Sequence, residues 1–293
     1  MLNCRTRHTA WMQSGANDRR ARSKGNSMSS NGPGLWGSGD AYEKYMGRWS
    51  RRIAPRFLDW LSPASDEEWL DIGCGTGALS SAILTKCAPR RVVGADTSDA
   101  FVAVALSQIR DSRFQPCTGS ATALPFDDDE FSIAVSGLVL NFIKDSEKAI
   151  TEMARVVHPG GLVALYVWDY AGHMQIMRYF FDAAAESDIR ARDFDDGVKA
   201  PLCRPGPLSR LFTRMGLVEI DVQGIDIPTA FADFDDYWTP FLGGTGSAPK
   251  YYASLTSDAQ NQLRDAVRHR LPTGPDGEIL LAVRAWAVKG RVR

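Results

Sequence analysis

The chain has 293 residues, of which 44% are hydrophobic and 24% are charged, a balance typical of one globular domain with a sizeable core and not of a disordered or small disulfide-rich protein. Its 34 Lys and Arg residues nearly match its 35 Asp and Glu residues, which argues against a protein body built to bind nucleic acid or an acidic membrane. Nowhere do ~18 uncharged apolar residues follow one another, so we expect no membrane span.

The cysteines and histidines show no metal or disulfide pattern. The five cysteines are scattered without a CxxC pair, and the four histidines lack the HxxxH and HExxH spacings. Such spacings place two metal ligands on one helix face. We therefore expect no bound metal and a reducing, cytoplasmic location.

Residues 1–39 predict a disordered basic tail. Between residues 1 and 30 a single acid, Asp18, faces six basic residues, and no apolar periodicity accompanies them. An Arg-rich, Ser-containing and acid-poor segment is also typical of an organelle transit peptide. A start at Met28 is a further alternative, so the presence of residues 1–27 in the mature protein is left open.

Residues 40–293 predict a single folded domain. Apolar spacing indicates helix at 42–61, strand at 67–72, helix at 78–85, strand at 92–96, helix at 99–110, strand at 131–138, helix at 146–157 and strand at 162–168. Alternating helices and nearly continuous apolar strands predict a doubly wound, Rossmann-like α/β fold with a mostly parallel sheet. The loops after Asp71, Asp96, Ser136 and Trp168 should then converge at the carboxyl edge of the sheet, where ligands bind.

The pattern changes after residue 170. Helices are predicted at 175–185, 207–215 and 257–271, with strands six and seven near 218–222 and 279–288. Two insertions separate them, at about 171–206 and 229–275, and the second is rich in aromatic residues. These rings are interpreted either as a lid over an apolar small molecule or as packing of the insertion on the core.

The glycine loop leaves two readings open. Gly73-x-Gly75-x-x-Ala78 satisfies a dinucleotide pattern, and Asp96 at the end of the second strand can accept hydrogen bonds from ribose hydroxyls. Both a nicotinamide enzyme and an enzyme that uses an adenosyl cofactor need these features.

Three motifs, the glycine loop among them, resemble those of class I S-adenosylmethionine-dependent methyltransferases. Residues 69–77, Trp-Leu-Asp-Ile-Gly-Cys-Gly-Thr-Gly, match the family's hh(D/E)hGxGxG loop. Residues 119–126 resemble its G-D-A-x-x-L-P-F loop, and residues 153–161 resemble its E-x-x-R-V-L-K-P-G-G turn. The resemblance covers about residues 40–168 and implies a seven-stranded sheet whose last strand is antiparallel. It also implies a cofactor-binding core at 40–170 and acceptor lids in the two insertions.

The resemblance implies roles for individual residues around S-adenosylmethionine. Asp71 would hold its ammonium group, the loop with Gly73, Cys74, Gly75 and Gly77 would pass its methionine part and ribose, and Asp96 would take both ribose hydroxyls. The remaining contacts are expected at Thr97, Ser120, Ala121 and Ser136. Ser120 departs from the family, which carries Asp there, and a hydroxyl accepts a weaker hydrogen bond than a carboxylate.

Methyl transfer to a small-molecule acceptor through an O, N or C nucleophile is the function that these features favour. Asp169 and His173 follow strand five, where the acceptor should lie, and are the candidate general bases. Either could instead cap the next helix. The alternatives are an NAD(P)-dependent oxidoreductase and a non-catalytic S-adenosylmethionine-binding protein. The acceptor, the attacking atom and the oligomeric state are left open.

Overall fold

The computed structural model describes residues 47–243 and 246–293, and the predicted tail at 1–39 lies outside this part of the chain. Within the described residues, seven strands form one sheet in the order β3-β2-β1-β4-β5-β7-β6. The strands are β1 (Glu68–Ile72), β2 (Arg91–Asp96), β3 (Phe114–Thr118), β4 (Phe131–Gly137), β5 (Val157–Trp168), β6 (Val218–Phe231) and β7 (Ile279–Arg291). β1 to β5 pair in parallel, and β7 runs antiparallel to both β5 and β6. The predicted fold class is therefore confirmed.

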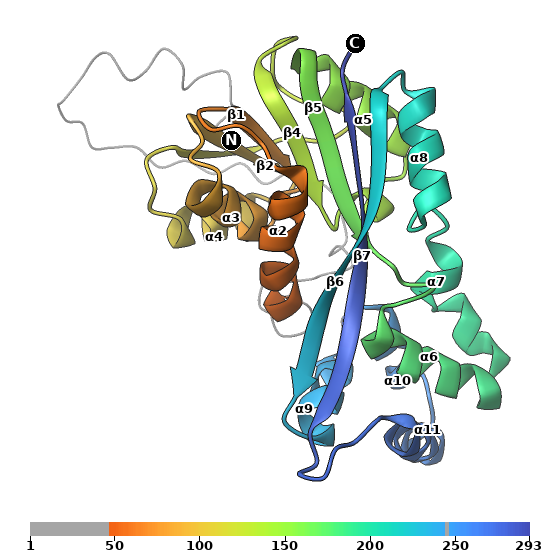
Figure 1. Cartoon of the computed structure of the whole chain (residues 1–293). Helices are drawn as coiled ribbons and strands as arrows, with labels where there is room; N and C mark the ends of the chain where they lie inside the picture. The colour runs from red at the N-terminus through yellow and green to blue at the C-terminus, as the bar shows by residue number, and fades with distance from the viewer. Residues whose placement is uncertain (1–46, 244–245) are drawn as a thin grey trace, which may run out of the picture.

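Helices cover both faces of the sheet (Figure 1). Those on one face are α2 (Arg48–Leu61), α3 (Ala78–Lys86) and α4 (Asp99–Gln108), and those on the other are α5 (Ser146–Arg155) and α8 (Pro205–Arg214). The central strands are apolar almost throughout because neither face meets water. Helix α2 shows how the pattern works: Ile53, Phe57 and Leu61 recur every four residues and are buried. The part of the predicted helix at 42–46 lies outside the described residues.

The last two strands extend past the rest of the sheet. β5 ends at Trp168, which lies opposite Ala285 of β7. β7 before Ala285 and β6 after Ile225 continue as a pair, from Asp226 opposite Arg284 to Phe231 opposite Ile279. On its other side this part of β7 makes isolated bridges, from Val283 to Met174 and from Ile279 to Thr273. We call this two-stranded extension the β6–β7 ribbon (residues 225–231 and 279–285). Strand six is thus much longer than the predicted 218–222, and it takes up the first three residues of the predicted second insertion.

A group of helices packs on the ribbon beyond the carboxyl edge of the sheet (Figure 1). We call it the helical cap. Its members are α6 (Gln175–Ser187), η5 (Ile189–Asp193), α7 (Asp196–Lys199), α9 (Phe234–Trp238), η6 (Thr239–Gly243), α10 (Ser247–Ala253) and α11 (Ser257–Arg270). Both predicted insertions contribute to it, so segments far apart in the sequence form one body.

Aromatic rings fill the interior of the helical cap. Phe180 of α6 stacks on Phe241 with ring centroids 4.8 Å apart, and Trp238 and Tyr251 lie at 6.0 and 6.2 Å from the same ring. Each of these side chains is at most 2% exposed. The hydroxyl of Tyr237 is also buried and donates to the carbonyl of Ile176 at 2.7 Å. Most of the aromatic density of the second insertion is therefore the core of the cap.

Two local predictions differ from the structure. β3 (Phe114–Thr118) has no predicted counterpart, because Gln115 and Pro116 interrupt its apolar pattern; as an edge strand it tolerates proline. Helix α5 ends at Arg155, and β5 begins at Val157 instead of residue 162, with a register irregularity between Phe131 and Ile133 of β4. None of the helices in 47–243 and 246–293 is both long and apolar enough to cross a membrane.

Candidate functional site

The loop between β1 and α3 is shaped by glycine. Gly73 has φ +71°, and a Cβ there would lie 2.6 Å from the side chain of Val139, so only glycine fits without displacing a neighbour. The Gly73 and Cys74 amides both donate to the Ala95 carbonyl, at 2.7 and 3.1 Å, which holds the loop against the end of β2. At Gly75, by contrast, an added Cβ would meet nothing within 4 Å. The loop is thus anchored on one side and open at Gly75.

Asp71 is a buried carboxylate next to this loop. It is the penultimate residue of β1 and only 1% exposed. Its Oδ2 accepts a hydrogen bond from the Ser80 hydroxyl at 2.6 Å. No Lys, Arg or His of the described residues forms an ion pair with it, and burial, aided by the nearby Asp96, raises its pKa to about 7.

Asp96 connects the loops that follow β1 and β2. Its Oδ2 accepts from the Gly75 amide at 3.0 Å, and its Oδ1 accepts from the Ser98 amide at 2.9 Å. Burial raises the pKa of this carboxyl as well, against the opposing effect of these amide hydrogen bonds. Each oxygen keeps a further lone pair for a ligand. The adjacent Thr97 is exposed.

Ser120 and Ala121 lie in the loop after β3, beside Asp96. The Gly119 amide donates to the Asp96 carbonyl at 2.9 Å, which draws this loop to the end of β2. The Ser120 hydroxyl accepts from the Thr122 amide at 3.3 Å and lies 3.1 Å from the Thr122 hydroxyl. The side chain that replaces the family's Asp is thus held in a local turn, and Ala121 is half-buried.

Ser136 closes the same edge on the other side of β1. Its hydroxyl is buried in β4 and donates to the Ile72 carbonyl at 2.8 Å. This bond fixes the end of β1 against β4, directly before the glycine loop. The Ser136 hydroxyl therefore donates its hydrogen to the protein backbone and not to a ligand.

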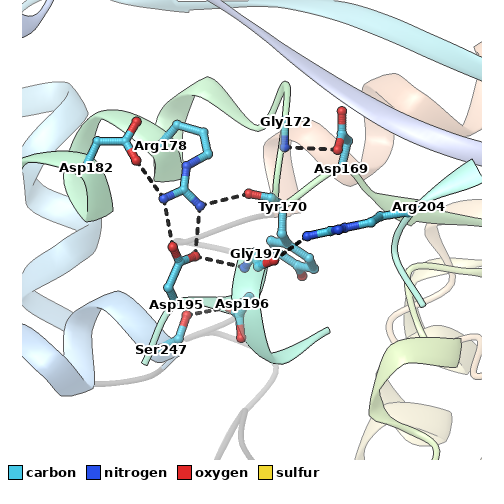
Figure 2. Close-up of polar contacts among 10 residues, drawn as sticks. All are labelled: Asp169, Tyr170, Gly172, Arg178, Asp182, Asp195, Asp196, Gly197, Arg204 and Ser247. Atoms are coloured by element: carbon cyan, nitrogen blue, oxygen red, sulfur yellow. Dashed lines mark hydrogen bonds and ion pairs between the residues drawn. The ribbon is translucent and has the colours of Figure 1, made fainter. Parts of the chain in front are cut away.

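Asp169 and His173 lie in the turn between β5 and α6. Both carboxylate oxygens of Asp169 accept backbone hydrogen bonds, Oδ1 from Gly172 at 3.0 Å and Oδ2 from His173 at 2.9 Å. Asp169 is buried and closes the turn before α6 (Figure 2). It does not cap that helix, whose N-cap residue is Met174 and has no side-chain cap, so the alternative capping interpretation is wrong. His173 is exposed. The pKa of Asp226 on the ribbon is lowered mainly by Arg284 and to a smaller extent by His173.

A buried ion pair holds the residue that follows Asp169. Arg178 of α6 donates to both oxygens of Asp195, each at 2.8 Å, and to the Tyr170 carbonyl at 3.0 Å. The side chains of Arg178 and Asp195 are 16% and 10% exposed. Figure 2 shows the guanidinium between Asp195, the Tyr170 backbone and the more exposed Asp182. The chain leaving β5 is therefore fixed by the first insertion.

The second insertion joins this network through Ser247. Its hydroxyl hydrogen-bonds the Asp196 carboxylate, beside Asp195 (Figure 2). Burial raises the pKa of Asp196. Both insertions thus meet next to the end of β5. The described residues hold no group of three or more His, Cys, Asp or Glu placed to bind a metal ion.

Comparison with known proteins assigns the core of this fold. Residues 70–165 match a family model described as a methyltransferase domain. A demethylmenaquinone methyltransferase from Staphylococcus carnosus is 37% identical over 116 residues, which are 39% of this chain and 46% of that protein. This region is a class I, S-adenosylmethionine-dependent methyltransferase domain.

Solved structures share the fold of the methyltransferase domain at low sequence identity. The YcgJ protein of Bacillus subtilis superposes with a TM-score of 0.54 at 19% identity, covering 84% of this chain and 99% of that one. A phosphoethanolamine N-methyltransferase of Haemonchus contortus, solved with phosphomonomethylethanolamine and S-adenosylhomocysteine, gives 0.55 at 18% identity, covering 89% and 57%. The chain spans less than half the length of the curated relatives first matched, 42 to 46%.

The structure of the methyltransferase domain brings most of the predicted cofactor residues to one edge. Asp71, the glycine loop, Asp96 and Ser136 lie at the ends of three neighbouring strands, and Ser120 and Ala121 follow a fourth. Asp169 and His173 lie after β5, among residues of the helical cap and ribbon.

Several residues that shape this edge have no predicted role. They are Ser80, Glu152, Arg178 and Asp195. Serine and acidic residues are common on helices, so their presence in the sequence does not indicate a role. Ser80 is recognised only by its hydrogen bond to Asp71, which the fold brings next to it. Arg155 stands inside the motif at 153–161, and Glu152 directly before it matches the Glu with which the family's E-x-x-R pattern begins. The motif alone does not say what these two side chains bind.

Proposed function

We propose that the protein is an enzyme that transfers a methyl group from S-adenosylmethionine to a small-molecule acceptor through an O, N or C nucleophile. The observation that carries this proposal is a pair of carboxylates, the buried Asp71 and the half-buried Asp96, on either side of an open glycine loop in a methyltransferase domain. Perturbed carboxylates at strand ends are typical of ligand sites.

The residues present fit this cofactor. Asp71 has no cationic partner among the described side chains, and the cofactor's ammonium would supply one. The open side of Gly75 gives the methionine chain and ribose close access to the backbone. Asp96 would accept from the ribose hydroxyls, with Thr97, Ser120 and Ala121 toward the adenine. Cys74, Gly73 and Gly77 shape the loop, and Ser136 fixes its starting point.

Methyl transfer requires these residues mainly to align the cofactor and the acceptor. When bound, S-adenosylmethionine would supply an electrophilic methyl group to an electron pair of the acceptor, the electrons of the carbon–sulfur bond would leave with S-adenosylhomocysteine, and a proton lost by the acceptor would pass to a base or to solvent. Holding the two reactants in line removes most of the entropic cost of their meeting. The chain's part is therefore to bind, orient and exclude water.

The acceptor side is proposed to lie between the cofactor edge and the helical cap, with the insertions at about 171–206 and 229–275 acting as lids. Support comes from the position of the cap beyond the carboxyl edge and from its direct connection to the end of β5 (Figures 1 and 2). A base role for Asp169 or His173 stays a prediction. His173 is the more accessible of the two, because it is exposed whereas Asp169 is buried.

Cofactor binding and an acceptor screen test the proposal. We expect calorimetry to show that S-adenosylhomocysteine binds, that NADH does not, and that Asp96→Ala weakens binding at least tenfold, as loss of charge-assisted hydrogen bonds implies. The screen, read out as S-adenosylhomocysteine release, should include demethylated quinones, because the S. carnosus relative is named for one.

The two alternatives predict different outcomes of these experiments. Binding of NADH and not of S-adenosylhomocysteine would overturn the proposal in favour of an oxidoreductase. Binding of S-adenosylhomocysteine without turnover of any acceptor would favour a non-catalytic binding protein.

A further inference from the structure

Two side chains of α5 hold the loop that follows β3. The Leu124 amide donates to Glu152 Oε2 at 2.8 Å, and Arg155 Nη2 donates to the Leu124 carbonyl at 3.2 Å. Arg155 Nη1 also donates to the Phe126 carbonyl at 2.9 Å. Both polar backbone groups of Leu124 are therefore bound by side chains from a distant helix.

The two side chains also bind each other. Arg155 Nε and Nη2 donate to Glu152 Oε1 and Oε2 at 2.8 and 2.9 Å, a bidentate pair. These side chains are 29% and 17% exposed. The hydrogen bonds from Arg155 lower the pKa of Glu152, so its carboxylate stays ionised near neutral pH. An ionised acceptor makes the bond from the Leu124 amide stronger than one to a neutral group.

The loop held by Glu152 and Arg155 lies next to the proposed cofactor site. With Asp71 at the end of β1 and Asp96 at the end of β2, a bound cofactor would extend along the edge from methionine to ribose, and its base would reach the end of β3. The segment there is Ser120 to Leu124, whose own internal bonds are few: the Ala123 amide to the Ser120 carbonyl at 3.0 Å and the contacts of Ser120 with Thr122.

We infer that Glu152 and Arg155 are positioning residues for recognition of the adenine base, acting through the backbone of Leu124 and Phe126 and not by contact with the ligand. This inference rests on the proposed cofactor site. Two side chains of α5 would then determine the shape of the loop next to Asp96. Helix α5 lies on the opposite face of the sheet from α3 and α4. Releasing the loop should weaken binding of the base and leave the methionine end in place.

The test compares S-adenosylhomocysteine with its inosine analogue, in which oxygen replaces the 6-amino group of the base. By calorimetry, Glu152→Ala should bind S-adenosylhomocysteine about tenfold more weakly than the native protein, while its affinity for the analogue changes less. The preference for adenine should thus shrink. Asp128→Asn is the matched control, because Asp128 binds the same guanidinium at 2.7 Å, is 73% exposed and does not hold the loop. It should stay within about twofold of the native protein.

Distinct results overturn the inference and the proposed function. If the native protein does not bind S-adenosylhomocysteine, the proposed function fails. If it binds but shows no preference for adenine, or if Glu152→Ala lowers the affinity for both ligands equally, the positioning role is wrong. Glu152→Gln, which keeps an acceptor for the Leu124 amide and loses the charge, repeats the test if the alanine variant does not fold; we expect a smaller loss in the same direction.

Discussion

At the scale of the residue, Asp71 is a buried carboxyl group at the cofactor edge whose ionised form is disfavoured by its surroundings. A carboxylate taken out of water costs free energy unless it is paired, and this one has a serine hydroxyl as its side-chain partner and another carboxylate nearby. The protein accepts this cost at the end of β1, where the sheet presents ligand-binding groups. Local unfavourable energetics at such a position are typical of function and not of stability.

The raised pKa of Asp71 predicts a pH-dependent affinity. Below about pH 7 the unliganded carboxyl is protonated, and it must lose that proton to pair with an ammonium group. We expect binding of S-adenosylhomocysteine to weaken as the pH falls from 8 to 6, by at most about tenfold per unit. Calorimetry across this range measures it. In Asp71→Asn the affinity should be lower at pH 8 and nearly independent of pH.

The raised pKa of Asp71 also makes the stability of the folded protein depend on pH. The folded protein binds this proton more tightly than the unfolded chain, whose carboxyl has its ordinary pKa of 3.8. Protonation of Asp71 therefore contributes stability that is fully present below pH 3.8 and is lost as the pH rises through about 7.

An affinity that stays flat between pH 6 and 8 in the native protein would contradict the pairing of Asp71 with the ammonium.

At the scale of the element, the segment after β5 depends on one ion pair. Arg178 of α6 and Asp195, which caps α7, enclose the Tyr170 carbonyl, and the Asp195 carboxylate also accepts the Gly197 amide at 2.8 Å. A Cβ on Gly197 would lie 2.6 Å from Arg178 Nη1, so glycine allows the close approach. One guanidinium thereby joins α6, the N-terminus of α7 and the backbone just after β5.

Removing that guanidinium should be costly. Arg178→Met leaves the buried Asp195 charge unpaired, so we expect the free energy of unfolding to fall by about 3 to 5 kcal/mol. Asp182→Asn changes the 63% exposed partner of the same arginine and should cost less than about 1 kcal/mol. Urea denaturation of both variants measures the difference. Equal and small effects would show that the pair contributes little to holding the segment.

At the scale of the whole molecule, the buried apolar residues form one continuous core with two parts, joined by the antiparallel strands β6 and β7. The first lies between the sheet and its covering helices, and the second is the aromatic interior of the helical cap. The β6–β7 ribbon connects them: its inner face carries buried Ile227, Leu281 and Val283, while Leu280 on the opposite face is 66% exposed. The cap is attached to the methyltransferase domain through this ribbon and through the network at the end of β5.

The aromatic part of the core in the cap and the cofactor edge should respond separately to mutation. Phe180→Ala removes the ring on which Phe241 stacks, and we expect it to lower the free energy of unfolding by about 3 to 5 kcal/mol. Leu280→Ala should cost about 0.5 kcal/mol or less. Affinity for S-adenosylhomocysteine should change less than threefold in Phe180→Ala under native conditions, because the cofactor edge uses other elements. Denaturation and calorimetry measure the two quantities. A large loss of affinity would show that the cap interior and the cofactor edge are coupled.

The sequence by itself determined the alternation of helices and strands, the glycine loop and the places of Asp71 and Asp96. These depend on local periodicity and on short motifs whose residues are neighbours in the chain. The weak edge strand β3 escaped prediction for the same reason, since Gln115 and Pro116 break the pattern where one side of the strand has no partner.

Only the tertiary structure decided which side chains meet across the fold. It placed the aromatic rings of the second insertion around Phe180, used both oxygens of Asp169 in a turn, and gave Glu152 the Leu124 amide as a partner 28 residues away. Such contacts follow from the order of the strands and from how the helices pack on them. No local pattern encodes them, because the energy of a buried ring or carboxylate depends on the neighbours that folding brings to it.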